Sequence, residues 1–242
     1  MQGVESQKGR LSFRGIQKTT LTDYPGQIAC TLFLAGCNFR CPYCYNIDLV
    51  QPSDTGNCVS DQEVLQFLEE RKRFLDGICI TGGEPLLHHE KLVPFLERVR
   101  TLGFKIKLDT NGSLPKAVDE VVRARIVDYI AMDIKAPLKR YGEVACAKVD
   151  LEAIQASVRL IRSSGVDYEF RTTVFSGLTL EDFESIGRWL AGSRKYCLQP
   201  MRSNVPLLDP GFSSRYSSPT EGFMKEAAGR LAPYFTEVEV RS

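Results

Sequence analysis

Gly36-Cys37-Asn38-Phe39-Arg40-Cys41-Pro42-Tyr43-Cys44-Tyr45-Asn46 is the stretch of this 242-residue chain that says most about its fold and chemistry. Three cysteines fall within eight residues, in the spacing C-x3-C-x2-C. A loop of this spacing can turn three thiolates toward one centre, and thiolates select zinc, copper(I) or iron–sulfur clusters. Structural zinc normally has four protein ligands, and the next cysteine after the loop, Cys58, lies fourteen residues beyond Cys44. A zinc loop closed by Cys58 and three unconnected core thiols remain the alternatives to a cluster with one open iron.

The overall composition narrows the class of protein. The chain has 31 Lys and Arg against 30 Asp and Glu, a net charge of +1, which argues against a general binder of nucleic acid or of a membrane surface. The start, MQGVESQKGR, has no apolar signal segment, and no apolar run is long enough to span a membrane. We therefore expect a cytoplasmic protein, in which eight cysteines indicate metal or redox chemistry.

Apolar runs rich in β-branched and aromatic residues alternate with stretches of helical spacing. The expected strands are Ile28–Leu34, Gly77–Ile80, Phe104–Thr110, Val127–Ile134, Tyr168–Val174 and Lys195–Gln199. The expected helices are Asp61–Phe74, His89–Leu102, Pro115–Arg123, Leu151–Ser163 and Leu180–Leu190. This order predicts an α/β fold with six parallel strands and helices outside, either an open doubly wound sheet or a partial barrel.

The two ends of the chain are simpler. Residues 1–14 are expected to form a flexible N-terminal extension, and residues 15–242 a single domain. The tail, residues 217–242, predicts one more helix and a short strand, Glu237–Arg241. Before it, residues 202–219 are rich in Ser, Pro and Asn and predict a long surface loop, a kind of segment that is often functional.

Polar residues stand where the second and third strands end. Thr81-Gly82-Gly83-Glu84-Pro85 follows the second strand, and its paired glycines would let the backbone approach a ligand closely. Glu84 could accept a hydrogen bond from an ammonium group. Asp109 and Asn111 share one face of the third strand and could bind a ribose. A plain strand-to-helix turn and a plain Asn-Gly turn are the structural alternatives.

The later strands end in the same way. Asp133 and Lys135 share a face at the end of the fourth strand, where the lysine could meet a carboxylate or the two could form a buried ion pair. Arg171, in the fifth strand, needs a partner, either a ligand or a structural carboxylate. Gln199 closes the sixth strand. The carboxyl ends of parallel strands are where α/β barrels build their sites.

The cysteine spacing, the aromatic Tyr43 before the third cysteine and the Gly-Gly-Glu-Pro turn together resemble the radical S-adenosylmethionine superfamily. The resemblance implies a partial (β/α)6 barrel of parallel strands, with a [4Fe–4S] cluster held by Cys37, Cys41 and Cys44. It implies that the open iron binds S-adenosylmethionine. The residues that it places in contact with this cofactor are Tyr43, Tyr45, Gly82, Gly83, Glu84, Asp109, Asn111, Asp133, Lys135, Arg171 and Gln199.

Residues 17–26, with the cysteine loop, resemble the glycyl radical enzyme activase branch, and within it the activating proteins of anaerobic ribonucleoside-triphosphate reductase. This resemblance implies reductive cleavage of S-adenosylmethionine to a 5′-deoxyadenosyl radical, which abstracts hydrogen from a glycine of a partner glycyl radical enzyme. It also implies a low-potential electron donor, such as flavodoxin or ferredoxin, and neither nucleic acid nor membrane as partner. Many activases have Cys-His-Asn where this chain has Cys44-Tyr45-Asn46, so Tyr45 departs from the commoner pattern.

Two other functions remain open from the sequence. One is a small-molecule radical enzyme similar to 7-carboxy-7-deazaguanine synthase, which would need a closed substrate pocket. The other is a zinc-stabilised interaction module without catalysis. The cysteines outside the loop are interpreted as buried small residues (Cys30, Cys79, Cys197) or as isolated thiols (Cys58, Cys146).

Overall fold

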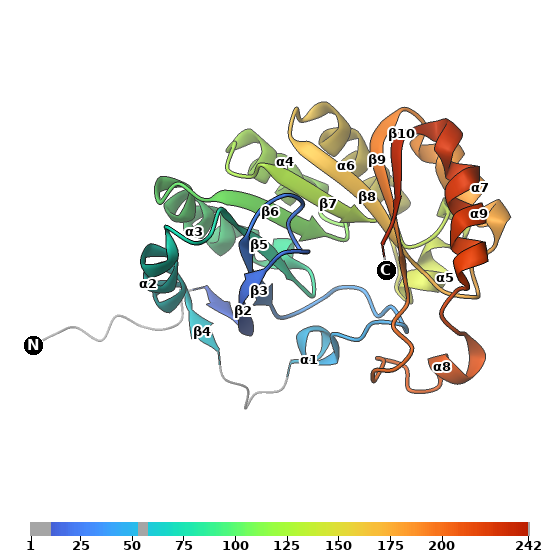
Figure 1. The fold of residues 1–242 in the computed structure, drawn as a ribbon, viewed down its shortest axis with the longest axis horizontal. Helices are drawn as coiled ribbons and strands as arrows, with labels where there is room; N and C mark the ends of the chain where they lie inside the picture. Colours follow the sequence, from blue (N-terminus) through green and yellow to red (C-terminus); the bar gives the residue numbers. More distant parts are fainter. Residues whose placement is uncertain (1–10, 53–57, 242) are drawn as a thin grey trace, which may run out of the picture.

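A curved eight-stranded sheet forms the centre of the computed structural model, which describes residues 11–52 and 58–241 (Figure 1). The strand order is β10-β9-β8-β7-β6-β5-β3-β2. The parallel strands are β3 (Ala29–Leu34), β5 (Gly77–Gly82), β6 (Lys105–Thr110), β7 (Tyr129–Asp133), β8 (Asp167–Val174), β9 (Ser193–Pro200) and β10 (Phe235–Val240). At the other edge, β2 (Gly15–Thr20) pairs with β3 in antiparallel orientation.

The main helices form one layer along the sheet. They are α2 (Asp61–Arg71), α3 (His89–Thr101), α4 (Pro115–Arg123), α6 (Leu151–Ser163), α7 (Leu180–Leu190) and α9 (Glu221–Leu231). Contacts run from α2 to α3, from α3 to α4 and from α4 to α6, and separately from α7 to α9. Short helical turns are α1 (Ile47–Val50), η2 (Pro85–His88), η3 (Leu138–Arg140), α5 (Tyr141–Ala145), α8 (Phe212–Arg215) and η4 (Ala232–Tyr234).

The two faces of the sheet differ in chemistry. On β6, Ile106 and Leu108 belong to the apolar core, while the intervening Lys107 and Asp109 are buried on the other face. The same alternation on β8 separates Phe170 from Arg171. Because side chains alternate along a strand, the core lies between sheet and helices, and the inner side of the curved sheet is charged.

Local signals fix several helix ends as expected. The Ser60 side chain accepts a hydrogen bond from the Glu63 N–H, and the Glu63 carboxylate accepts one from the Ser60 N–H. Together the two bonds form a capping box. Gly103, Gly165 and Gly192 follow helices with positive φ angles of 91°, 75° and 81°, a conformation that favours glycine.

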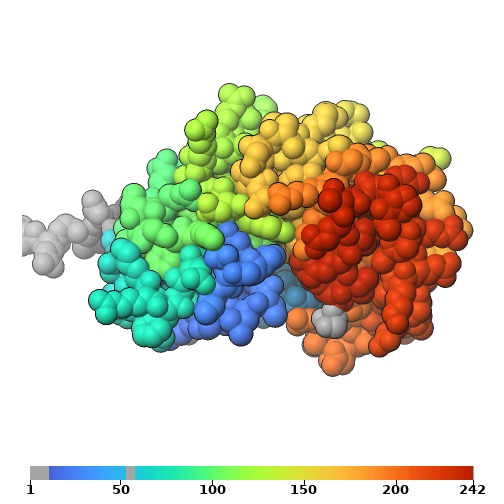
Figure 2. Space-filling model, turned by 45° about the horizontal axis from the view of Figure 1, so that its top comes forward, coloured from blue at the N-terminus to red at the C-terminus, as the bar shows by residue number. Residues whose placement is uncertain are grey.

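The partial barrel class is confirmed, and the sheet is wider than the six expected strands. The tail strand lies next to β9 as a seventh parallel strand. The antiparallel β2 was not predicted, because its sequence, GIQKTT, is mostly polar and shows little apolar alternation. The curvature brings the N-terminal strands, in blue, and the C-terminal segment, in red, to the same face of the molecule (Figure 2).

The expectation that residues 1–14 form a flexible extension is wrong for residues 11–14. Leu11 and Phe13 are buried, and the Phe13 ring lies 5.0 Å from that of Phe95. β1 (Ser12–Phe13) pairs with β4 (Val59–Ser60) in a small second sheet. Two apolar side chains in a polar stretch are enough to anchor this segment. Residues 1–10 lie outside the described part of the chain.

The expected loop at residues 202–219 contains the short helix α8, and it lies beside the cysteine loop (Figure 1). The Leu208 N–H donates to the Cys44 carbonyl at 2.8 Å, and the Asp209 N–H donates to the Pro42 carbonyl at 3.0 Å. Among the described helices, none is long and apolar enough to cross a bilayer.

Candidate active site

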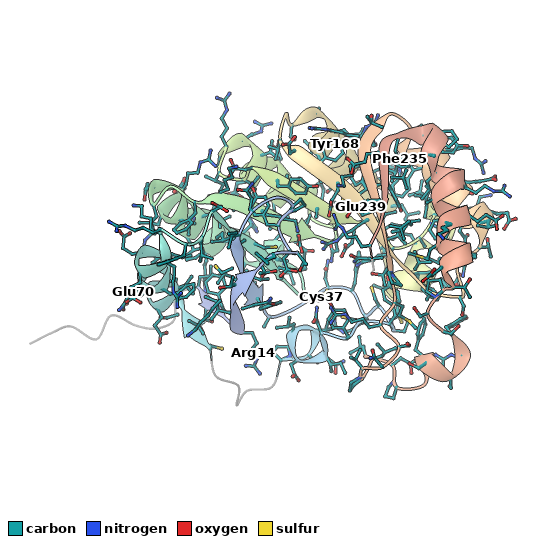
Figure 3. All side chains as sticks on the ribbon, in the orientation of Figure 1. Arg14, Cys37, Glu70, Tyr168, Phe235 and Glu239 are labelled. Atoms are coloured by element: carbon teal, nitrogen blue, oxygen red, sulfur yellow. The ribbon has the colours of Figure 1, made fainter. Side chains whose placement is uncertain are left out.

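The cysteine loop leaves the end of β3 and runs to α1, and Figure 3 labels Cys37 below the ends of the parallel strands. Three backbone hydrogen bonds hold its start. Gly36 donates its N–H to the Leu49 carbonyl at 2.7 Å, and Glu84 donates its N–H to the Gly36 carbonyl at the same distance. The Gly83 N–H reaches the Leu34 carbonyl at 2.9 Å. The Gly-Gly-Glu-Pro turn is therefore attached to the first residues of the cysteine loop.

This close approach explains the paired glycines. A Cβ on Gly82, which has a φ of +136°, would lie 2.1 Å from the Leu34 carbonyl oxygen. A Cβ on Gly83 would lie 2.0 Å from the Gly36 carbonyl oxygen and 3.1 Å from the Cys37 Cβ. Only glycine allows the two turns to touch here.

The three loop cysteines are free thiols, with Cys41 buried and the other two half-buried. Burial raises the pKa of each thiol, because the charged thiolate loses its hydration. The Lys135 ammonium acts in the opposite direction on the pKa of all three. Lys135 therefore lies within electrostatic reach of the whole trio and favours its deprotonated, metal-binding form.

The donors at the cysteine loop bear on which metal group it could hold. Structural zinc normally has four protein ligands, and the next cysteine along the chain, Cys58, lies beside Arg14, 4.0 Å from its Nη1. Within residues 11–52 and 58–241, one group of three ligand atoms lies within 4.8 Å of one another, and it is Glu169, Cys197 and Glu239. The three loop thiols are a donor set that fits an iron–sulfur cluster.

A chain of alternating charges leads from the inside of the sheet to the cysteine loop. Lys107 pairs with Asp109, which contacts Arg171 at 3.1 Å. Arg171 Nε contacts Asp133 at 2.5 Å, and Lys135 Nζ contacts the other oxygen of Asp133 at 2.9 Å. The residues predicted at the ends of three successive strands are therefore brought together, and Lys107 is an added member.

The charge chain keeps Asp133, Lys135 and Arg171 ionised. Burial opposes ionisation of Asp133, but Arg171 and Lys135 outweigh it and hold the pKa of this carboxyl well below its usual range. Burial likewise acts against Lys135 and Arg171, and their carboxylate neighbours raise the pKa of both. With Lys107 and Asp109 included, the charge chain has three cations and two anions. Its Lys135 end can therefore accept one more anionic group.

Glu84 joins the glycine turn to the end of β6. Its carboxylate accepts hydrogen bonds from the Leu86 N–H at 3.1 Å, the Thr110 hydroxyl at 2.9 Å and the Asn111 N–H at 2.6 Å. Complete burial nevertheless raises its pKa to about 7. In this conformation Glu84 positions the two turns, and its contact with a cofactor ammonium stays a prediction.

Asn111 connects this bracing to the cysteine loop. Its side-chain amide donates to the Asn38 carbonyl oxygen at 2.9 Å, and Asn38 in turn donates to the Ser113 hydroxyl at 2.8 Å. The sequence reasoning missed Asn38 and Ser113. Their signal is weak, since a lone amide and a lone hydroxyl mark many turns.

Tyr43 is buried in an aromatic group. Its ring stacks on Phe175 at 5.4 Å and 29°, and Phe212 lies 6.1 Å away. Its hydroxyl is buried without a hydrogen-bond partner among the described residues. Neither phenylalanine was predicted, because both come from segments distant in sequence and read only as apolar.

Two predicted contacts lie apart from the charge chain. Tyr45 is exposed, and the Arg202 guanidinium lies 4.6 Å from its ring centroid. Gln199 is half-buried on β9, beside Thr173 in the strand register. In the part of the chain that the structure describes, neither side chain bonds to the other predicted site residues.

The trio of Glu169, Cys197 and Glu239 lies on three neighbouring strands, β8, β9 and β10. Arg241 contacts both carboxylates, at 2.6 Å for Glu169 and 3.1 Å for Glu239, and Lys195 contacts Glu239 at 2.8 Å. Two cations already neutralise this group, so it acts as an ion-pair network between strands.

The parallel barrel, the glycine turn and the three cysteines facing a lysine define a protein that holds a cluster and a small cofactor at its strand ends. Residues 31–190 match the model of the radical SAM superfamily, more than half of the chain. The chain belongs to this superfamily, and it is an enzyme whose cofactors are a [4Fe–4S] cluster and S-adenosylmethionine.

Three relatives represent two kinds of enzyme. A putative glycyl-radical enzyme activating enzyme of Methanocaldococcus jannaschii is 29% identical over 233 residues, covering 94% of this chain and 95% of that protein. A 7-carboxy-7-deazaguanine synthase of Koribacter versatilis is 32% identical over 151 residues, covering 62% of each chain. A pyruvate formate-lyase-activating enzyme of Listeria monocytogenes is 32% identical over 122 residues, covering 47% of this chain and 48% of that one.

Solved structures share the fold. QueE from Escherichia coli matches with a TM-score of 0.57 at 15% identity, over 96% of this chain and 94% of that one. SuiB of Streptococcus suis bound to its precursor peptide matches with a TM-score of 0.67 at 11% identity, over 86% of this chain. The chain spans about half the length of SuiB (47%).

Proposed function

We propose that this enzyme activates a glycyl radical enzyme, with anaerobic ribonucleoside-triphosphate reductase as its target. Similarity to an activating enzyme over nearly the full length of both chains supports the activase class. The resemblance of residues 17–26 and of the cysteine loop supports the reductase as target. The whole of residues 15–242 would act as one domain.

One observation carries the assignment of the site. Lys135 ends a charge chain on three strands and lowers the pKa of all three loop thiols, so a cation lies within electrostatic reach of the proposed cluster ligands. In the proposal Cys37, Cys41 and Cys44 hold the cluster, and Lys135 receives the carboxylate of S-adenosylmethionine. When bound and reduced, these cofactors supply the 5′-deoxyadenosyl radical that takes a hydrogen atom from the partner's glycine α-carbon.

The remaining predicted contacts fall into two roles. Gly82 and Gly83 let the turn approach the cysteine loop, and Glu84 and Asn111 keep both turns in place. Asp109, Asp133 and Arg171 hold Lys135 in position, while Tyr43 would face the adenine. Tyr45 and Gln199 would contact the cofactor from positions outside the charge chain.

The partners and location follow from the same proposal. The electron donor would be a low-potential flavodoxin or ferredoxin, and no nucleic acid or membrane would take part. The near-zero net charge supports this part of the proposal. We propose the cytoplasm as the location, because free loop thiols suit a reducing compartment.

The first experiment tests the site. Protein purified without oxygen should be brown, with about four iron and four sulfide per chain, and Cys41→Ala should lose this colour. Cys30→Ala is the matched control, since Cys30 is buried in β3 outside the loop. Colourless wild-type protein with one zinc per chain would refute the proposal.

The second experiment tests the target. Reduced protein and S-adenosylmethionine are mixed with anaerobic ribonucleotide reductase, and electron paramagnetic resonance should then show a glycyl doublet. Similarity to a 7-carboxy-7-deazaguanine synthase favours a second candidate, a small-molecule reaction. Formation of 7-carboxy-7-deazaguanine from its pterin precursor, without a glycyl signal, would establish that candidate and exclude the activase.

A further inference from the structure

Lys107 is a buried cation to which the proposed function gives no role. It lies on the inner face of β6, and its side chain is only 2% exposed. Its ammonium group pairs with Asp109, and the Cys79 sulfur lies 3.7 Å away. A cysteine sulfur is a weak acceptor, so Asp109 is the partner that offsets the cost of burying this charge.

The two carboxylates of the charge chain divide their oxygens between different cations. Oδ1 of Asp109 faces Lys107, and Oδ2 contacts Arg171 Nη2 at 3.1 Å. Oδ1 of Asp133 contacts Arg171 Nε at 2.5 Å, and Oδ2 contacts Lys135 Nζ at 2.9 Å. Arg171 therefore bridges two carboxylates through two different nitrogen atoms.

Lys107 keeps Arg171 in this bridging position. A guanidinium group prefers to meet both oxygens of one carboxylate at once. While Lys107 occupies Oδ1 of Asp109, Oδ2 alone is left for Arg171. Without Lys107, a two-oxygen pair with Asp109 would draw Arg171 away from Asp133. Asp133 would then hold Lys135 more tightly, because it would have lost its other cation.

The charge count leads to the same result. With Lys107, the charge chain has three cations and two anions, and without it the two signs balance. The excess positive charge that Lys135 offers to an anionic ligand therefore depends on a side chain at the opposite end of the charge chain. Such dependence extends over several contacts in a buried site, because the interior screens charge weakly.

We infer that Lys107 is a positioning residue that raises the affinity of the site for the carboxylate of S-adenosylmethionine. It acts on Lys135 through Asp109, Arg171 and Asp133. The inference rests on the proposed function, which places this carboxylate at Lys135. It adds a determinant of cofactor affinity that is joined to the site by ion pairs.

The test measures the affinity of two ligands for protein with an oxidised cluster, under anaerobic conditions and without reductant, so that no cleavage occurs. The ligands are S-adenosylmethionine and decarboxylated S-adenosylmethionine, which lacks only the carboxylate. The variants are Lys107→Met and the double variant Lys107→Met with Asp109→Asn. Lys105→Met is the matched control, because it removes an exposed cation two residues away on the same face of β6.

Lys107→Met should bind S-adenosylmethionine about tenfold more weakly, the effect of losing one charged contact. Its affinity for the decarboxylated ligand should not change. The double variant should return to within about twofold of wild type, because Arg171 and Lys135 then face Asp133 alone and one positive charge is again in excess. Lys105→Met should bind both ligands as wild type does.

Unchanged affinity for S-adenosylmethionine in Lys107→Met overturns the inference. Equal weakening for both ligands also overturns it, since a distorted site would then be the cause. A double variant that stays as weak as Lys107→Met has the same consequence. If Lys107→Met does not fold, Lys107→Gln removes the charge while its amide still donates to Asp109, and the same two affinities decide. Wild-type protein that holds no cluster, or that binds no S-adenosylmethionine, would instead overturn the proposed function.

Discussion

Replacing Gly83 by alanine perturbs the contact that joins the glycine turn to the cysteine loop. The added Cβ would lie 2.0 Å from the Gly36 carbonyl oxygen, and real Cβ contacts essentially never fall below 3.0 Å. The two turns must therefore separate by about 1 Å. That separation weakens the hydrogen bonds from Gly83 to Leu34 and from Glu84 to Gly36. With about 1 kcal/mol for each bond and about 1–3 kcal/mol for overpacking, the cost is about 3–5 kcal/mol.

The assay has two readouts under anaerobic conditions. Denaturant unfolding of the cluster-free protein gives the change in stability, and iron per chain after reconstitution reports the geometry of the cysteine loop. Gly229→Ala is the matched control, because Gly229 lies in α9 with nothing within 4 Å of an added Cβ. It should gain about 0.5–1 kcal/mol as a helical Gly-to-Ala change. Wild-type stability and full iron content in Gly83→Ala would refute the reasoning.

Three further predictions concern buried charge and metal content. Burial raises the pKa of Glu84 to about 7. The free energy of unfolding of the wild-type protein should therefore fall as pH rises from about 4.5 to 7. In denaturant unfolding measured over this pH range, Glu84→Gln should show a weaker dependence on pH. Burial opposes ionisation of Glu169, but Arg241 lowers its pKa to about 2. The contribution of ionised Glu169 to stability should therefore be lost as pH falls from about 4.5 to 2. In the same assay, Arg241→Met should show a weaker loss of stability in acid. Metal analysis should find the same iron content in Cys197→Ser as in wild type. It should also find no zinc bound by the wild-type trio of Glu169, Cys197 and Glu239, because cations already neutralise both carboxylates.

The alternation of strand-like and helix-like segments in the sequence predicts most of the fold. All six expected strands occur in the sheet, because each is an apolar run whose residues reach the core. β2 was not predicted, because an edge strand has one neighbour and tolerates polar residues. Its sequence therefore lacks the alternation of apolar and polar residues that indicates a strand. The burial of Phe13 was not predicted for a related reason: a single aromatic residue in a polar stretch forms no periodic pattern.

The candidate site shows a different limit. Asp109, Asp133, Lys135 and Arg171 could be chosen from the sequence, because a charged residue at the end of an apolar strand needs a partner. The ion pair of Asp133 with Lys135 was one of the alternatives open from the sequence, and it is present. The pairing of Lys107 with Asp109 and the two contacts of Arg171 were not predicted, because Arg171 belongs to a strand that lies later in the chain. Such pairings depend on strand register, which the sequence does not encode locally.

The charge chain also bears on how the site is assembled before any cofactor arrives. Buried charges are costly unless each has a partner, and here every carboxylate contacts two cations. Lys135 contacts one carboxylate, Asp133, and its ammonium group lowers the pKa of each of the three loop thiols. On the inner side of the sheet the charges of this charge chain are therefore paired, and its excess positive charge lies at Lys135, toward the cysteine loop. A site built in this way is prepared for an anionic group before binding, so little reorganisation should accompany it.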